Sequence, residues 1–169
     1  MPVTMHTGPY EDLVTWLEDH GVPFELHDHP VTYTAAATAH VEGVSERAFA
    51  KVVGLRLADG SHVLAVVDAA DVVDLVRLAE AVDSEWVTLL SERELTAILP
   101  ACEAGTVPPI PELSHSAVIA DEGIRGDQRI TFHAGSHRTA VRVDRAAWER
   151  EAGIRYASFA TPAPHAVPA

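Results

Sequence analysis

The chain has 169 residues, of which 47% are hydrophobic and 22% charged, a composition typical of one globular domain and unlike that of a disordered or fibrous protein. Twelve Lys and Arg residues against 25 Asp and Glu give a formal charge of −13, which argues against a protein that coats nucleic acid. The one cysteine, Cys102, excludes an internal disulfide and a multi-cysteine zinc site.

Residues 7–21 predict an amphipathic helix that ends at Gly21, because apolar residues recur at helical spacing. A short strand follows over residues 23–27. Thr34 can cap a small alanine-rich helix that ends near Gly43. The apolar positions of the first helix are Tyr10, Leu13, Val14 and Leu17.

Residues 48–57 and 62–68 are β-rich and flank an Asp-Gly turn, which predicts a β-hairpin. Residues 71–82 predict a helix, and residues 86–90 predict a strand. The helical spacing in this segment is that of Val72, Leu75, Val76 and Ala79.

Ser91 and Glu94 form a capping-box pattern, which predicts a helix over residues 92–99 before a proline-bearing loop over residues 100–111. Three further strands and a closing helix complete a mixed pattern that indicates an α+β domain. We expect the domain to span residues 1–155 and a Pro/Ala-rich tail to span residues 156–169. The late strands are predicted at residues 116–121, 129–133 and 139–144, and the helix at residues 145–152.

No apolar run approaches the roughly 20 residues needed to cross a bilayer. The N-terminal sequence also lacks the basic and apolar regions of a secretory signal. We therefore expect no membrane partner and a cytoplasmic location.

Lys51 is the only lysine of the chain and the one polar residue in an apolar row of its strand. An ammonium group is a compact donor of three hydrogen bonds, which suits a pocket that holds one small polar group. A lysine that only extends from a strand edge toward solvent is the equally weighted alternative. Strand alternation places Lys51 with Phe49, Val53, Leu55 and Leu57.

His133 ends a strand and leads directly into a glycine turn, a suitable place for a hydrogen-bonding or proton-carrying group. On this strand Ile130 and Phe132 are expected to face the core, opposite His133. The loop from Gly105 to Pro109 combines a glycine with two prolines and can aim backbone N–H groups at a ligand, or it can be a purely structural turn.

Ten histidines raise the possibility of a metal site, but the only close pairs are His27 with His29 and His133 with His137. The chain has no H-E-x-x-H motif, no phosphate-binding glycine loop and no G-x-S-x-G elbow. Cys102 has no evident activating base nearby in the sequence. We therefore expect no metal and no cofactor.

Taken together, these features resemble the YbaK family of free-standing aminoacyl-tRNA deacylases, which is related to the editing insertion of bacterial prolyl-tRNA synthetase. The resemblance runs from about Tyr10 to Glu151. Its motifs are His29-Pro30, Lys51, the sequence AVVDAADVVDLVRLAEAV, the G-x-x-x-P loop from Gly105 to Pro109, VIAD ending at Asp121, and FHAGSH at residues 132–137.

The resemblance implies a curved, mixed or antiparallel sheet surrounded by helices, and metal-free hydrolysis of the ester at the 3′ end of a mischarged tRNA, such as Ala- or Cys-tRNA(Pro). It implies catalytic roles for Lys51, for backbone donors at Gly105 and for His133. It also implies an aminoacyl-tRNA substrate, an aminoacyl-tRNA synthetase as partner and weak binding of nucleic acid by the protein alone. Further substrate-binding positions are expected at Tyr33, Thr34, Phe49, Pro109 and Gly135.

Two positions depart from the family pattern and bear on the amino acid removed. Val52 stands where some relatives have a hydroxyl residue, and Thr139-Ala140 stands where some have an acidic one. Two other hypotheses follow from the same residues: a binding module of this fold that recognises an amino acid, a nucleotide or a synthetase without turnover, and a metal-dependent hydrolase built on the histidines.

Overall fold

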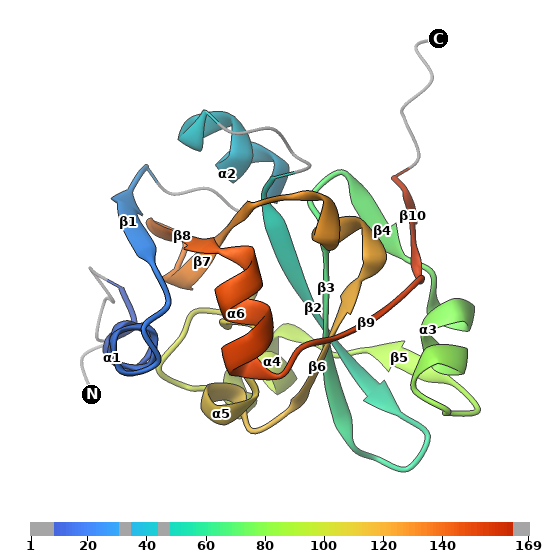
Figure 1. Ribbon diagram of the computed structural model, residues 1–169. Helices are drawn as coiled ribbons and strands as arrows, with labels where there is room; N and C mark the ends of the chain where they lie inside the picture. The colour runs from blue at the N-terminus through green and yellow to red at the C-terminus, as the bar shows by residue number, and fades with distance from the viewer. Residues whose placement is uncertain (1–8, 31–34, 44–47, 164–169) are drawn as a thin grey trace, which may run out of the picture.

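The computed structural model describes residues 9–30, 35–43 and 48–163. The strands in these ranges form three sheets, and helices cover the sheets from several sides (Figure 1). This mixed arrangement confirms the predicted α+β class. The helices are α1 (Glu11–Asp19), α2 (Ala35–Glu42), α3 (Leu75–Ala81), α4 (Glu92–Ile98), α5 (Pro111–Ser114), the 3-10 helix η1 (Glu122–Gly126) and α6 (Arg145–Ala152).

The largest sheet has five strands in the order β5-β2-β3-β6-β9. Its centre is the predicted hairpin, because β2 pairs antiparallel with β3 on either side of the Asp-Gly turn. Strands β6 and β9 then add in parallel. The strands are β2 (Ala50–Leu57), β3 (His62–Asp68), β5 (Val87–Leu89), β6 (Ala117–Asp121) and β9 (Arg155–Ala157).

Both faces of the five-stranded sheet are buried, which explains why β3 is a continuous apolar run. Leu64 and Val66 face the main core, where they pack with α1, α6 and the second sheet. Val63 and Val67 face the opposite core, beneath Leu78 of α3. Lys51 therefore belongs to a strand that has no fully solvated face.

The second sheet is antiparallel, with the order β1-β8-β7. As expected from alternation, Ile130 and Phe132 of β7 face the main core. Strand β7 also contacts the residues just before β2, because the Thr131 N–H donates to the Ala48 carbonyl at 3.1 Å. The strands are β1 (Phe24–Asp28), β7 (Arg129–Ser136) and β8 (Thr139–Asp144).

The capping box at Ser91 and Glu94 is confirmed, with both reciprocal hydrogen bonds present. The prediction of one helix over residues 71–82 is wrong at its start. Residues Asp71–Val73 form β4, and the Asp74 side chain caps α3 by accepting from two backbone N–H groups of its first turn. Of the four positions that sequence spacing marked as buried, only Ala79 is buried, and Val76 is 70% exposed.

Residues expected to begin the tail are ordered as far as β10 (Ala160–Pro162), which pairs antiparallel with β4. The Asp121 carboxylate holds this segment by accepting from the N–H groups of Phe159 and Ala160, each at 2.9 Å. Phe159 is fully buried. Asp121, the last residue of the VIAD motif, therefore has a structural role that local sequence does not reveal. No helix of the described residues is long and apolar enough to span a bilayer.

Candidate functional site

Lys51 lies near the start of β2, opposite Val67 of β3. Its side chain is half-buried, and strand alternation puts it on the same face as Val53 and Leu55. An amine in this position can reach a ligand at the end of the sheet while its methylene groups cover apolar surface.

His133 lies on β7 and is 9% exposed. The ring centroids of Phe49 and His137 are each 5.4 Å from that of His133, and both rings meet it edge to face. The His29 ring lies 6.2 Å away. The His133 Nε2 atom is 3.4 Å from the Thr38 hydroxyl oxygen of α2. Sheet, helix and loop residues thus meet around one imidazole.

Burial, together with the smaller effects of the neighbouring His137 and His29, lowers the pKa of His133 to about 4. At neutral pH this imidazole is therefore uncharged. It can donate or accept a hydrogen bond, but it is a weak base and does not supply positive charge.

Hydrogen bonds join the loop over residues 103–106 to residues 133–137, which form the irregular end of β7 and the residue after it. We call these two segments the loop-bulge unit. The Glu103 N–H donates to the Gly135 carbonyl at 3.0 Å, and the Gly135 N–H donates to the Thr106 carbonyl at 3.2 Å. His137 Nε2 lies 2.9 Å from the Ala104 carbonyl oxygen. These contacts place the glycine loop beside the histidine cluster.

The two glycines of this unit have different tasks. Gly135 is buried with φ +93, and a Cβ atom there would lie 2.6 Å from the Tyr10 Cβ, so only glycine fits. Gly105 has φ +82 but is exposed, and its nearest neighbour would be the His137 ring at 3.9 Å. Gly135 therefore shapes the strand, whereas Gly105 leaves the loop open to solvent.

The structure brings Phe49, His133 and the Gly105 loop together. Phe49 and His137 both contact the His133 ring, and His137 also binds the Ala104 carbonyl of the loop. Lys51 follows Phe49 by two positions, which is about 7 Å along an extended chain. Pro109 lies toward α6, where its carbonyl accepts from the Trp148 indole N–H at 3.0 Å. Tyr33 and Thr34 lie outside the described residues.

Sequence reasoning did not assign roles to His29, Thr38, Glu103 or His137 in this cluster. His29 and His137 belong to motifs that carry the resemblance, and the second motif places His137 four residues after His133. In a regular strand, two residues four positions apart are too far from each other for their rings to touch. The contact between the two rings depends on the bulge between His133 and Ser136, which the sequence spacing does not reveal.

Cys102 is 2% exposed, and burial raises its pKa to about 12, with Asp12 adding in the same direction. Its thiol therefore stays protonated and is a poor nucleophile. Within the described ranges, no group of three His, Cys, Asp or Glu side chains is arranged to hold a metal ion.

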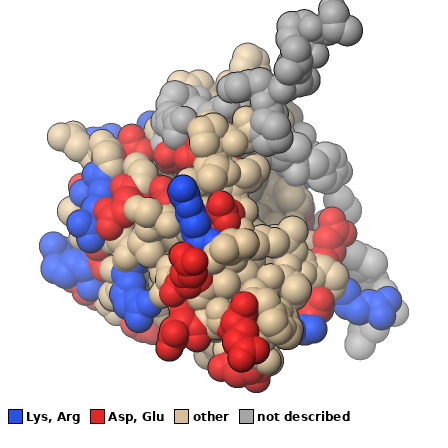
Figure 2. All heavy atoms as spheres, turned by 90° about the vertical axis from the view of Figure 1, so that its right-hand side faces the viewer, with Lys and Arg blue, Asp and Glu red and all other residues tan. Residues whose placement is uncertain are grey.

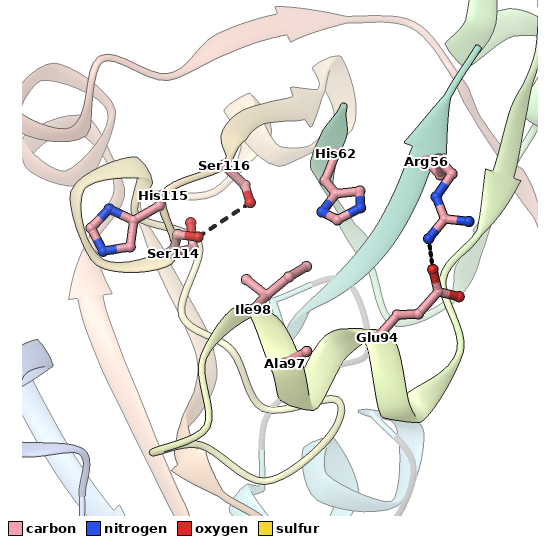
Figure 3. A pocket seen from close by; sticks show the side chains of 8 residues that line it. All are labelled: Arg56, His62, Glu94, Ala97, Ile98, Ser114, His115 and Ser116. Carbon is pink, nitrogen blue, oxygen red and sulfur yellow. Dashed lines mark hydrogen bonds and ion pairs between the residues drawn. The ribbon is translucent and has the colours of Figure 1, made fainter. Parts of the chain in front are cut away.

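A separate pocket of about 440 Å³ is lined by polar and apolar residues, and two pairs of its polar residues bind each other (Figure 3). Arg56 forms an ion pair with Glu94, and the Ser116 hydroxyl donates to the Ser114 carbonyl at 3.2 Å. None of the predicted site residues lines this pocket. On the face that carries α3, β4 and β10, acidic and basic side chains are interspersed (Figure 2).

Residues 29–151 match the family model of the aminoacyl-tRNA editing domain. No curated protein matches the sequence of this chain.

Solved structures share the fold at low sequence identity. A hypothetical protein has a TM-score of 0.80 and 17% identity, covering 88% of this chain and 99% of that one. A protein assigned as a trans-editing enzyme for prolyl-tRNA synthetase has a TM-score of 0.77 and 19% identity, covering 89% and 96%. A Marinobacter aquaeolei protein assigned to signal transduction has a TM-score of 0.69 and 14% identity, covering 90% of this chain and 31% of that one.

Proposed function

The chain belongs to the aminoacyl-tRNA editing domain family, and we propose that it hydrolyses the ester of a mischarged tRNA with Lys51, the Gly105 loop and His133 at its active site. The observation that carries this proposal is the family match over residues 29–151, which includes all three positions. Water adds to the ester carbonyl, the carbon–oxygen bond to the ribose breaks, and a free amino acid and a terminal hydroxyl are released.

Each of the three positions has a task that fits its surroundings. The half-buried Lys51 amine anchors the terminal ribose or the carbonyl. Backbone N–H groups of the exposed Gly105 loop stabilise negative charge that develops on the carbonyl oxygen. His133, uncharged at neutral pH, orients the aminoacyl group or the attacking water through hydrogen bonds.

The reaction proposed here uses neither a metal nor a protein nucleophile. The only thiol is protonated at neutral pH because it is buried. Water can attack an ester whose carbonyl is already oriented and polarised.

Ala- and Cys-tRNA(Pro) are the proposed substrates, and Phe49 with Tyr33, Thr34, Pro109 and Gly135 is proposed to surround the amino acid. The likeness to a protein assigned to trans-editing for prolyl-tRNA synthetase supports this choice. The formal charge of −13 supports weak binding of tRNA by the protein alone and delivery by a synthetase partner.

The test is hydrolysis of Ala-, Cys- and Pro-tRNA(Pro) with chelator present, by the wild type, Lys51→Ala and Arg56→Ala. We expect turnover of one mischarged substrate and a loss of about 100-fold or more in kcat/KM for Lys51→Ala, as for removal of a group that stabilises the transition state. Arg56 lies on the same strand but lines the separate pocket, so its variant should match the wild type.

Three results would contradict parts of this proposal. Full activity of Lys51→Ala would overturn the role of the amine, and loss of activity with chelator would favour a metal-dependent hydrolase. Absence of turnover by folded wild type would favour a binding module without catalysis.

A further inference from the structure

The tip of the glycine loop is a single peptide unit, Ala104–Gly105, that is held differently from the base of the loop. The base is fixed by backbone hydrogen bonds: Glu103 N–H to the Gly135 carbonyl at 3.0 Å, Gly135 N–H to the Thr106 carbonyl at 3.2 Å, and Thr106 N–H to the Glu103 carbonyl at 3.1 Å. These bonds need no particular side chain. The hydrogen bonds of the base therefore do not use the His137 side chain.

The tip has one anchor from a side chain. His137 Nε2 lies 2.9 Å from the Ala104 carbonyl oxygen, and because a carbonyl only accepts, Nε2 carries the hydrogen. The backbone N–H of His137 donates to the Glu103 carboxylate at 3.2 Å, which fixes the histidine itself beside the loop. The imidazole is mostly buried, with a side-chain exposure of 16%.

The planarity of the peptide links this anchor to a donor. In a trans peptide the carbonyl and the following N–H point in opposite directions, so holding the Ala104 carbonyl sets the direction of the Gly105 N–H. Among the described residues, nothing accepts from the Ala104 or Gly105 N–H groups. Both donors are therefore available to a ligand.

Glycine at position 105 makes the anchor necessary. A glycine at φ +82 can rotate with little steric cost, so an unheld peptide here can turn over and present its carbonyl where the N–H had been. An acceptor at that place would repel the negative oxygen that develops during ester hydrolysis.

We propose that His137 is a positioning residue that holds the Ala104–Gly105 peptide in the orientation that presents the Gly105 N–H to the substrate ester. The role rests on the proposed deacylase function. His137 itself acts only through the peptide and does not contact the reacting atoms.

Two matched variants separate the hydrogen bond from the size and polarity of the side chain. In His137→Gln the terminal nitrogen lies as many bonds from Cα as Nε2 does, so it can still donate to Ala104. In His137→Asn the nitrogen is one bond shorter and cannot reach. His62→Ala, in the separate pocket, is the control for loss of a histidine elsewhere.

We expect His137→Asn to lower kcat about tenfold with KM changed less than about twofold, because a donor used in the transition state is lost in part of the population. His137→Gln should stay within about threefold of the wild type. In a ¹H–¹⁵N spectrum, the Gly105 amide signal should be shifted or broadened in His137→Asn and close to that of the wild type in His137→Gln. All variants should have the same midpoint of thermal unfolding as the wild type.

If the wild type is active and His137→Asn has the same kcat, this inference is overturned and the proposed function still stands. An unchanged Gly105 amide in His137→Asn would overturn it whether or not the protein is active. A wild type that hydrolyses no ester would overturn the proposed function and, with it, the catalytic purpose of the anchor.

Discussion

The loop-bulge unit and the pocket of Figure 3 are both polar and both contain histidines, but their polar groups are used differently. In the pocket, Arg56 is neutralised by Glu94 and the serines bind each other. In the loop-bulge unit, backbone hydrogen bonds and the half-buried His137 side chain hold the loop, while the N–H groups at the tip have no protein acceptor among the described residues. A hollow lined by polar residues therefore indicates a reactive site less strongly than backbone donors that are held in place and have no protein acceptor among the described residues.

The largest loss of stability is expected for substitution of the buried glycine of the loop-bulge unit. Gly135→Ala should destabilise the protein by about 3 kcal/mol, because the strain of a positive φ adds to an overpacked contact with Tyr10. Gly60→Ala is the matched control, since Gly60 has a similar φ of +87 with nothing within 4 Å, and should cost about 1 kcal/mol. Urea unfolding measures both, and equal losses would contradict the packing argument.

A second difference is the response of folding to pH. Because the pKa of His133 is about 4 when folded and 6.5 in the unfolded chain, the unfolded state binds more protons between these values. This group therefore weakens folding as pH falls from 6.5 to 4, by about 3 kcal/mol over the whole window, and has no effect above it.

His133→Phe keeps a ring against Phe49 and removes the titration. Its free energy of unfolding should fall less than that of the wild type between pH 6.5 and 4, whereas at pH 7.5 the difference between the two proteins should reflect packing alone. Parallel pH curves for the two proteins would show that folding does not lower the pKa of His133.

The smallest effect should come from the pocket. Arg56 and Glu94 are 43% and 31% exposed, so Arg56→Ala should cost about 0.5 kcal/mol, and less at high salt. The arginine is the informative partner to replace, because Glu94 also completes the capping box of α4. A loss above about 2 kcal/mol would mean that this ion pair acts as a buried one.

Much of the fold follows from signals that lie close together in the chain. The Asp-Gly turn specifies the β2–β3 hairpin, and Ser91 with Glu94 specifies the start of α4. Alternation along β7 correctly separated Ile130 and Phe132 from His133. Each of these features is decided by neighbours within a few residues.

The error at residues 71–73 has a long-range cause. Residues 71–73 form a strand because β10 pairs with them, and β10 is held in place by Asp121, which lies 39 residues before Ala160. No local pattern contains that information. The same holds at the candidate site, where Lys51, Gly105 and His133 could be selected by residue type and motif, but their surroundings could not.

The sequence by itself determined the class of fold, most of its elements and the residues with chemical capability, because helix caps, tight turns and side-chain periodicity are short-range effects. Only the tertiary structure decided that a strand bulge carries His137 onto the Ala104 carbonyl and that His133 is buried among aromatic rings. Contacts between distant segments depend on packing and strand register, and these are set by the whole molecule.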